Sequence, residues 1–414
     1  MNRVLTTQSV KEELSLPIDH EHQFPIHYAY DYLNGGMAYL KLPVLRLNDY
    51  LSSTQFLRIG CNISSGPETQ LPERGPNAID ISPSKAGLPW ATGILFCRQN
   101  KYWQLTLDTT RLFLALFAAD ESAQKMVKSD HSVAEISRKE LRYNMEEGWV
   151  KFPTYLYTEG DPQRTRLLAI MNVFVFVFDD FWEMHETSSF VSIQQEFISR
   201  MNPDFDNGDK PRTTLQSMID HAIQEIIELD HKYGNNAGQE MIDLMIRFFT
   251  RPPPPAKYND MEEFLLYRHE DAALLFVLGC AKFALNSSVD FDSPHISRYL
   301  RLIKDHLAVA NDLGSWEKEK RAYDTGKVLY LINAVDVVKN LFHLPSDRAA
   351  ISMTEALQLQ IEVDIDAEIQ RMIDGDALTA EEWRFIDATL YVMSGNVFVS
   401  TVMSRYGGET YRLA

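Results

Sequence analysis

The sequence predicts an all-α protein, and three observations lead to that prediction. From about residue 105 onward, apolar residues recur at the spacing of one face of a helix. The segments between these stretches are short and rich in Pro, Gly and Asn, which interrupt helices. No stretch alternates apolar and polar residues between hairpin turns, as half-buried strands do. We therefore expect ten or more helices packed against one another.

The expected helices follow one another from the middle of the chain to its end. Four consecutive prolines at 252–255 must end one helix, and Asp260-Met-Glu-Glu263 is typical of a capping box that begins the next. Residues 1–90 are broken by Gly and Pro and should be less regular. No interdomain linker is evident, so we expect residues 1–414 to form one domain. The expected helical segments are 105–128, 162–187, 214–233, 238–250, 260–285, 294–323, 325–343, 352–373 and 379–405.

Composition excludes several classes of function. The chain carries 40 Lys and Arg against 58 Asp and Glu, a net charge of −18, which would repel nucleic acids and anionic membrane surfaces. Its 3 cysteines form no CxxC pair, so neither a zinc site nor a disulfide framework is expected. Residues 1–11 do not resemble a secretory signal, and the apolar run 167–178 is shorter than the roughly 20 residues that span a membrane. We expect a soluble cytoplasmic protein with no nucleic-acid or membrane partner.

An acidic cluster ends the apolar run 167–178. On a helix, Asp179 and Glu183 lie one above the other, with Asp180 beside them. Like charges at this spacing repel, and a divalent cation such as Mg²⁺, which prefers oxygen ligands, would compensate them. Two alternatives stay open: a solvated acidic helix end, or a buried strand followed by a nucleophilic aspartate. The length of the apolar run favours the helix.

A second set of oxygen-bearing side chains follows later in the chain. Asn311, Ser315 and Glu319 are spaced by four residues, so on a helix they fall within about 80° of arc. An amide, a hydroxyl and a carboxylate oxygen can ligate one Mg²⁺ and leave positions for water and phosphate oxygens. The alternative is an ordinary polar surface. However, Asn and Ser are poor residues for the middle of a helix, so their regular spacing indicates a function.

Together, the two segments resemble the metal-binding motifs of class I terpene synthases: an aspartate-rich motif at Asp179–Glu183 and an NSE triad at Asn311–Glu319. The resemblance covers about residues 95–406. It implies a single-domain α-helical bundle around a central apolar active-site cavity. It also implies that Asp179, with Asp180 or Glu183, and the triad of Asn311, Ser315 and Glu319 hold three Mg²⁺ ions, which bind the diphosphate of an isoprenyl substrate.

Other residues resemble the positions that contact diphosphate in this family. Arg268 resembles the pyrophosphate-sensing arginine, with Asp271 at the linker position and Ala272 at the effector position, where glycine is common. Arg405 and Tyr406 resemble the closing arginine–tyrosine pair.

Lys318 also resembles a basic residue that contacts diphosphate. The sequence departs from the family at Val399, where a tryptophan is often found. The structural alternative for each basic residue is a solvated surface charge.

The resemblance implies a terpene cyclase that ionises a linear isoprenyl diphosphate and releases inorganic diphosphate. Farnesyl diphosphate is the expected substrate and a cyclic sesquiterpene hydrocarbon or alcohol the expected product, while geranyl and geranylgeranyl diphosphate stay open. Phe176 lies one turn before Asp179, so we expect its ring in the substrate cavity. The alternatives are a chain-elongating isoprenyl diphosphate synthase, a non-enzymatic helical scaffold and an inactive cyclase-like protein. Whether the protein forms a homodimer stays open.

Overall fold

The computed structural model describes most of the chain from Asn77 onward. The described residues are 77–81, 92–94, 97–125, 127–128, 131–142, 148–183, 191–202, 205, 208, 211–375, 377–403 and 406. The expected irregular segment 1–90 therefore lies outside the described residues, apart from 77–81.

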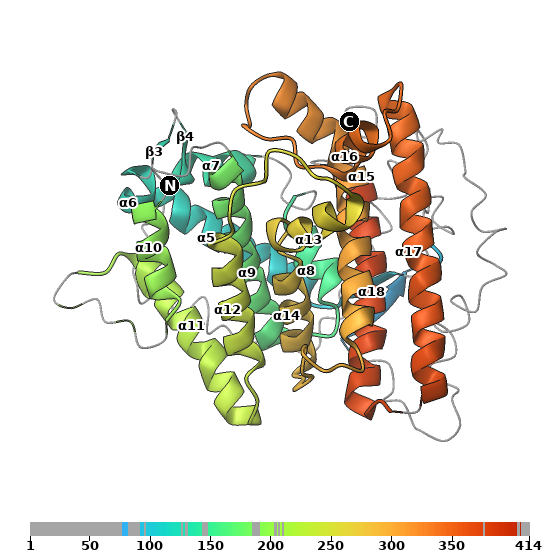
Figure 1. The fold of residues 1–414 in the computed structure, drawn as a ribbon. Coiled ribbons are helices and arrows are strands. Elements are labelled where there is room, and N and C mark those ends of the chain that lie inside the picture. Colours follow the sequence, from blue (N-terminus) through green and yellow to red (C-terminus); the bar gives the residue numbers. More distant parts are fainter. Residues whose placement is uncertain are drawn as a thin grey trace.

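Helices make up most of the described fold, which confirms the predicted all-α class (Figure 1). Even the segment with strand-forming residues before Asp179 belongs to a helix, so the strand alternative is wrong. The helices are α5 (Trp103–Ala119), α6 (Glu121–Lys125), α7 (Val133–Arg142), α8 (Lys151–Leu156), α9 (Pro162–Glu183), α10 (Val191–Arg200), α11 (Thr214–Tyr233), α12 (Ala237–Phe249), α13 (Met261–Asp271), α14 (Leu274–Leu285), α15 (Ser297–Asp324), α16 (Ala334–Leu341), α17 (Asp347–Gly375) and α18 (Ala380–Val402).

Two short antiparallel strand pairs accompany the helices. Strand β1 (Ala78–Ile81) pairs with β2 (Cys97–Asn100), with Ala78 opposite Asn100, and β3 (Val127–Lys128) pairs with β4 (His131–Ser132). With two to four residues each, these strands are too short to show an alternating pattern in the sequence.

The expected helix over 260–285 is in fact two helices. Asp260 caps α13, because its side chain accepts a hydrogen bond from the backbone N–H of Glu263 at 2.8 Å. The carboxylate of Glu263 accepts from the backbone N–H of Asn259 at 2.8 Å, so one of the two hydrogen bonds of the predicted capping box is confirmed. The chain then breaks at Ala272 and Ala273, and Ala273 has a φ of +55° in the left-handed region. Since a residue in this conformation cannot continue a right-handed helix, α14 begins anew at Leu274.

The expected helix over 325–343 begins later than predicted. Gly326, with a φ of +67°, follows the end of α15, and a loop runs as far as Asn333. Asn333 caps α16 by accepting a hydrogen bond from the backbone N–H of Val335 at 2.9 Å. The loop over 325–333 therefore lies beside the end of α15, where part of it borders the cavity described below.

The helices enclose one large apolar core. α15 packs against α17 and α18 on one side of the molecule, while α12 packs against α14 and α9 packs against α5 on the other (Figure 1). α18 also crosses α8 so closely that a Cβ atom added to Gly395 would lie 2.1 Å from the carbonyl oxygen of Tyr155. α18 is long and apolar enough to span a membrane, but 89% of its most apolar window is buried inside the protein, as in a core helix.

Candidate active site

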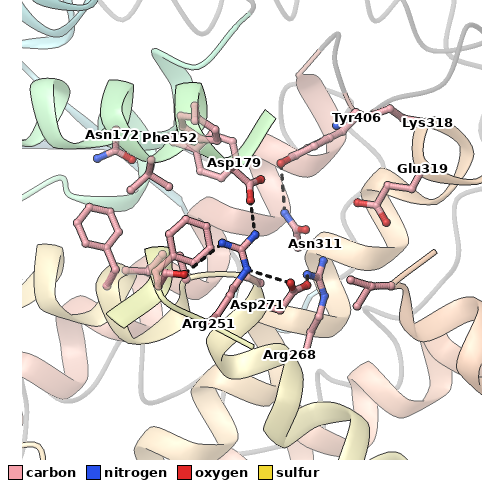
Figure 2. A pocket seen from close by; sticks show the side chains of 18 of the residues that line it. Phe152, Asn172, Asp179, Arg251, Arg268, Asp271, Asn311, Lys318, Glu319 and Tyr406 are labelled. Atoms are coloured by element: carbon pink, nitrogen blue, oxygen red, sulfur yellow. Dashed lines mark hydrogen bonds and ion pairs between the residues drawn. The ribbon is translucent and has the colours of Figure 1, made fainter. Parts of the chain in front are cut away.

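One cavity collects most of the candidate residues. Its volume is about 1170 Å³ including its open mouth. Asp179 from α9 and Asn311 from α15 both line it, so the two oxygen-bearing helix faces meet at a shared opening (Figure 2). Its other lining residues come mainly from α8, α9, α12, α14, α15 and the α13–α14 break.

The wall formed by α9 changes from charged to apolar along its length. Asp179 is 28% exposed, whereas Val175, one turn earlier, is 8% exposed and Asn172, a further turn away, only 5%. At 1.5 Å per residue, Asn172 lies about 10 Å from Asp179 along the helix. Phe176 lines the same wall, and its ring stacks on Trp149 with centroids 5.2 Å apart. Asp179 therefore stands near the mouth, and the deeper wall is mostly apolar.

On α15, Asn311 and Glu319 line the cavity, whereas Ser315, between them on the same helix, is buried and does not belong to the cavity lining. The Ser315 hydroxyl is fully buried and has no hydrogen-bond partner among the described residues. The amide nitrogen of Asn311 donates to the Tyr406 hydroxyl at 3.5 Å, which leaves the amide oxygen for another partner. A buried hydroxyl without a partner is costly, and a cation bound between Asn311 and Glu319 would satisfy it. The donor set therefore fits Mg²⁺.

Burial raises the pKa of Glu319 above the ordinary value of a glutamate, although the nearby Arg268 opposes this shift. One carboxylate oxygen of Glu319 accepts a hydrogen bond from the side chain of Asn333 at 2.9 Å. Asn333 therefore fixes the orientation of Glu319, and a bound cation would favour the charged form of this carboxyl group.

Arg268 is buried beside two carboxylates. Its Nε and Nη2 donate to Asp312 at 3.0 and 2.7 Å, and its Nη1 pairs with Asp271. Burial alone would lower the pKa of Arg268, but Asp312, Asp271 and Glu319 raise it well above its ordinary value, so the guanidinium stays charged. Burial also raises the pKa of Asp312, against the opposing effect of Arg268.

Asp312 was not among the residues predicted from the sequence. It is fully buried and accepts hydrogen bonds from Arg268 and from the backbone N–H of Ala334 at 2.8 Å. It thereby links α15 to the arginine on α13 and to the start of α16. Its place in the sequence, directly after Asn311, was the available signal, because an acid beside a metal ligand often orients the site.

Arg251 is the second residue that sequence reasoning missed. It follows α12 and pairs with Asp179 at 2.8 Å and with Asp271 at 3.2 Å, as Figure 2 shows. Its side chain is 2% exposed. In the sequence, Arg251 is only a single basic residue before the prolines at 252–255. This position indicates the end of a helix and no binding role.

Only some of the remaining predicted residues line the cavity. Lys318 and Tyr406 line the cavity, with the Lys318 ammonium 5.9 Å from the centre of the Tyr406 ring. Asp180 is half-buried on α9 and does not belong to the cavity lining. Glu183 is the last residue of α9, but its side chain lies outside the described part of the structure, as does all of Arg405.

Within the described part of the chain, no group of three or more His, Cys, Asp or Glu side chains could hold a metal ion. The donor set explains this, because two of the three candidate ligands on α15 are an amide and a hydroxyl. On α9, the carboxylate of Asp179 is paired with Arg251.

Comparison with known proteins points to one family. Residues 171–358 match the family model described as terpene synthase family 2, C-terminal metal binding. The chain is 24% identical over 345 residues to Terpene cyclase 6 of Gibberella fujikuroi, and this match covers 82% of this chain and 87% of that protein. It is also 28% identical over 156 residues to a bifunctional sesterterpene synthase of Aspergillus aculeatus, but this match covers only 36% of this chain and 21% of that longer protein.

Solved structures show the same fold. Aristolochene synthase from Penicillium roqueforti superposes with a TM-score of 0.56 at 15% identity, over 71% of this chain and 94% of that one. Germacradien-4-ol synthase from Streptomyces citricolor superposes with a TM-score of 0.52 at 14% identity, over 73% of this chain and 94% of that one. The matched metal-binding region, the fungal relatives and this fold together support a class I terpene synthase. The family implies a prenyl diphosphate substrate, a diphosphate product and dependence on a divalent metal.

Proposed function

We propose that this terpene cyclase ionises farnesyl diphosphate with the help of three Mg²⁺ ions and releases diphosphate with a cyclic sesquiterpene hydrocarbon or alcohol. One observation carries the proposal: the acidic end of α9 and the oxygen-bearing face of α15 border the same cavity, whose deeper wall is mostly apolar. Such a cavity suits a molecule with an anionic head and a hydrocarbon tail.

We propose separate roles for the residues that bind metal and those that bind diphosphate. Asp179 would hold cations from α9, with Asp180 or Glu183 as a second ligand, and Asn311, Ser315 and Glu319 would hold one from α15. When bound, Mg²⁺ supplies positive charge that stabilises the departing diphosphate. Arg268, Lys318, Arg405 and Tyr406 are proposed to bind and orient the same diphosphate group.

The mostly apolar wall of the cavity is proposed to protect and stabilise the carbocation. Once the C–O bond breaks, an allylic cation remains, and water must be kept away from it. Phe176, whose ring stacks on Trp149 and is tilted against Phe152, presents an aromatic surface in this part of the cavity. Aromatic faces attract cations, so we propose that Phe176 stabilises the migrating charge and shapes the product.

Two observations support a cyclase over a chain-elongating synthase. The α15 face carries Asn, Ser and Glu, whereas chain-elongating enzymes carry a second aspartate-rich motif. A relative matched over most of its length is named a terpene cyclase. The choice of farnesyl diphosphate over shorter and longer substrates is a proposal, since relatives matched over less of their length include a sesterterpene synthase.

The decisive experiment is product analysis with the purified protein. Geranyl, farnesyl, geranylgeranyl and geranylfarnesyl diphosphate would each be incubated with Mg²⁺, and the extracts analysed by gas chromatography and mass spectrometry. We expect a cyclic C15 product from farnesyl diphosphate alone. A product that forms only when isopentenyl diphosphate is added, and keeps its diphosphate, would instead establish chain elongation.

We further propose that the protein acts in the cytoplasm as one domain over residues 1–414. Its charge of −18 supports this location, because the protein would be repelled by anionic membrane surfaces. Cell fractionation tests the location, limited proteolysis tests the single domain, and light scattering on a sizing column tests whether it forms a homodimer.

A further inference from the structure

The guanidinium of Arg251 is fully engaged at the edge of the cavity. Its Nη2 donates to Asp179 at 2.8 Å, its Nε donates to Asp271 at 3.2 Å, and its Nη1 donates to the carbonyl oxygen of Phe248 at 3.2 Å. It also lies 4.0 Å from the centre of the Phe248 ring. Arg251 therefore joins a proposed metal ligand on α9 to the break between α13 and α14.

These contacts belong to a longer row of alternating charges. Asp271 pairs with both Arg251 and Arg268, and Arg268 pairs in turn with Asp312 on α15. The row thus runs from Asp179, on the first proposed metal-binding face, to Asp312, the neighbour of Asn311, on the second. Figure 2 shows its members from Asp179 to Arg268. A change of partner at one end alters the electrostatic balance along the whole row.

We propose that Arg251 occupies the Asp179 carboxylate before metal ions bind, and that a cation must displace it from this carboxylate. This inference rests on the proposed function of Asp179 as a metal ligand. Asp271 retains Arg251 near the cavity after displacement, because it holds the guanidinium through Nε, a different nitrogen from the one that binds Asp179.

The displaced guanidinium then needs a new anion. Arginine binds phosphate oxygens well, often through two parallel hydrogen bonds, and Arg251 lines the cavity in which the diphosphate would lie. Arg251 therefore makes metal binding at α9 weak without diphosphate and stronger with it. It is a positioning residue that couples the loading of the metal to the presence of the substrate's diphosphate group.

A merely structural role for Arg251 predicts the opposite result. If the arginine only held α9 against the α13–α14 break, its removal would loosen the site and weaken metal binding. If it competes with the metal, its removal takes one competing partner away from Asp179 and strengthens metal binding. The two roles therefore differ in the sign of the change.

The test is a titration of Mn²⁺ followed by electron paramagnetic resonance, with and without inorganic diphosphate. Wild-type protein is compared with Arg251→Gln and Arg251→Lys. Arg200→Gln is the matched control, because Arg200 is also buried, pairs with Asp220 at 3.3 Å, lies 5.0 Å from the ring of Phe205 and does not line the cavity.

Without diphosphate, Arg251→Gln should bind Mn²⁺ about fivefold more tightly than wild type, the factor that corresponds to one partly exposed ion pair. The enhancement of Mn²⁺ binding by diphosphate should fall by at least a similar factor, since the two ligands are thermodynamically linked. Arg251→Lys should lie between the two, and Arg200→Gln should match wild type.

The outcomes separate this inference from the proposed function. If wild-type protein binds no Mn²⁺ even with diphosphate, the proposed function itself is wrong. If wild type binds Mn²⁺ but Arg251→Gln binds it equally or more weakly, the inference about Arg251 is wrong. Circular dichroism checks that each variant folds, and should Arg251→Gln fail to fold, Arg251→Lys decides by the same criterion.

Discussion

Glu319 has a raised pKa because it is buried at the end of the α15 face. A metal ion needs the deprotonated carboxylate, so protons compete with the metal as the pH falls through this raised pKa. We expect the affinity for Mg²⁺, measured by calorimetry in the presence of diphosphate, to decline at a higher pH than an ordinary glutamate would allow. Glu319→Gln should bind Mg²⁺ weakly at every pH, without this dependence. An affinity in wild type that stays constant down to the pKa of an ordinary glutamate would contradict the prediction.

Phe176 and Phe174 provide a matched pair on α9. Phe176 lines the cavity, whereas Phe174 is fully buried away from it, against Phe113 and Phe117. Phe176→Leu should change the ratio of terpene products several-fold and lower kcat by less, because the ring guides the cation after ionisation. Phe174→Leu should lower the free energy of unfolding by about 1–3 kcal/mol and leave the products unchanged. Identical product profiles for Phe176→Leu and wild type would exclude the proposed role.

Within the candidate site, the shared helix of the α15 residues was predictable from the sequence, whereas the position of Asp180 outside the cavity lining was not. Asn311, Ser315 and Glu319 share a face because of helical spacing alone, and the structure has that helix. Arg251 and Asp312 were not predicted, because their roles depend on partners that lie 20 to 72 residues away in sequence. Such long-range ion pairs leave no periodic pattern.

At the scale of helices, Gly395 allows α18 to pack against α8 almost backbone to backbone. An added methyl group would meet the carbonyl group of Tyr155, which cannot rotate away as a side chain can. Gly395→Ala should therefore lower the free energy of unfolding by about 2–3 kcal/mol, measured by denaturant titration. In Gly375→Ala, where an added methyl group meets nothing within 4 Å, stability should stay the same or rise by up to about 1 kcal/mol. Equal stabilities of the two variants would contradict this account of the α8–α18 contact.

Long helices were predicted more accurately than short ones and breaks. The segment 214–233 was predicted with the bounds that α11 has in the structure. By contrast, α7, α8 and α10 were missed, since six to ten residues show too few helical repeats. The break at Ala272 and Ala273 was also missed, because alanine favours helices and gives no sign in the sequence of the left-handed conformation that Ala273 adopts.

At the scale of the whole molecule, the net charge of −18 opposes both folding and the binding of an anionic substrate. Any salt screens this repulsion, but Mg²⁺ should also bind at the site. We therefore expect MgCl₂ to raise the melting temperature more than NaCl at equal ionic strength, and inorganic diphosphate to raise it further only when Mg²⁺ is present. Glu319→Gln should lose most of the difference between the two salts, and EDTA should abolish the effect of diphosphate. Equal melting temperatures in both salts would show that Mg²⁺ acts only by screening.

The gradient along α9, from Asp179 near the opening to the buried Asn172, sets the direction in which a substrate can enter. Under the proposed function, a hydrocarbon chain enters first and its charged head stays at the opening, so the distance from the opening to the far wall would limit the chain length. We expect selectivity for the number of isoprene units to reside in the side chains of the deeper wall, not in the groups that hold the head. Enzymes with the same opening can thus acquire new substrates by replacing a few residues at the closed end.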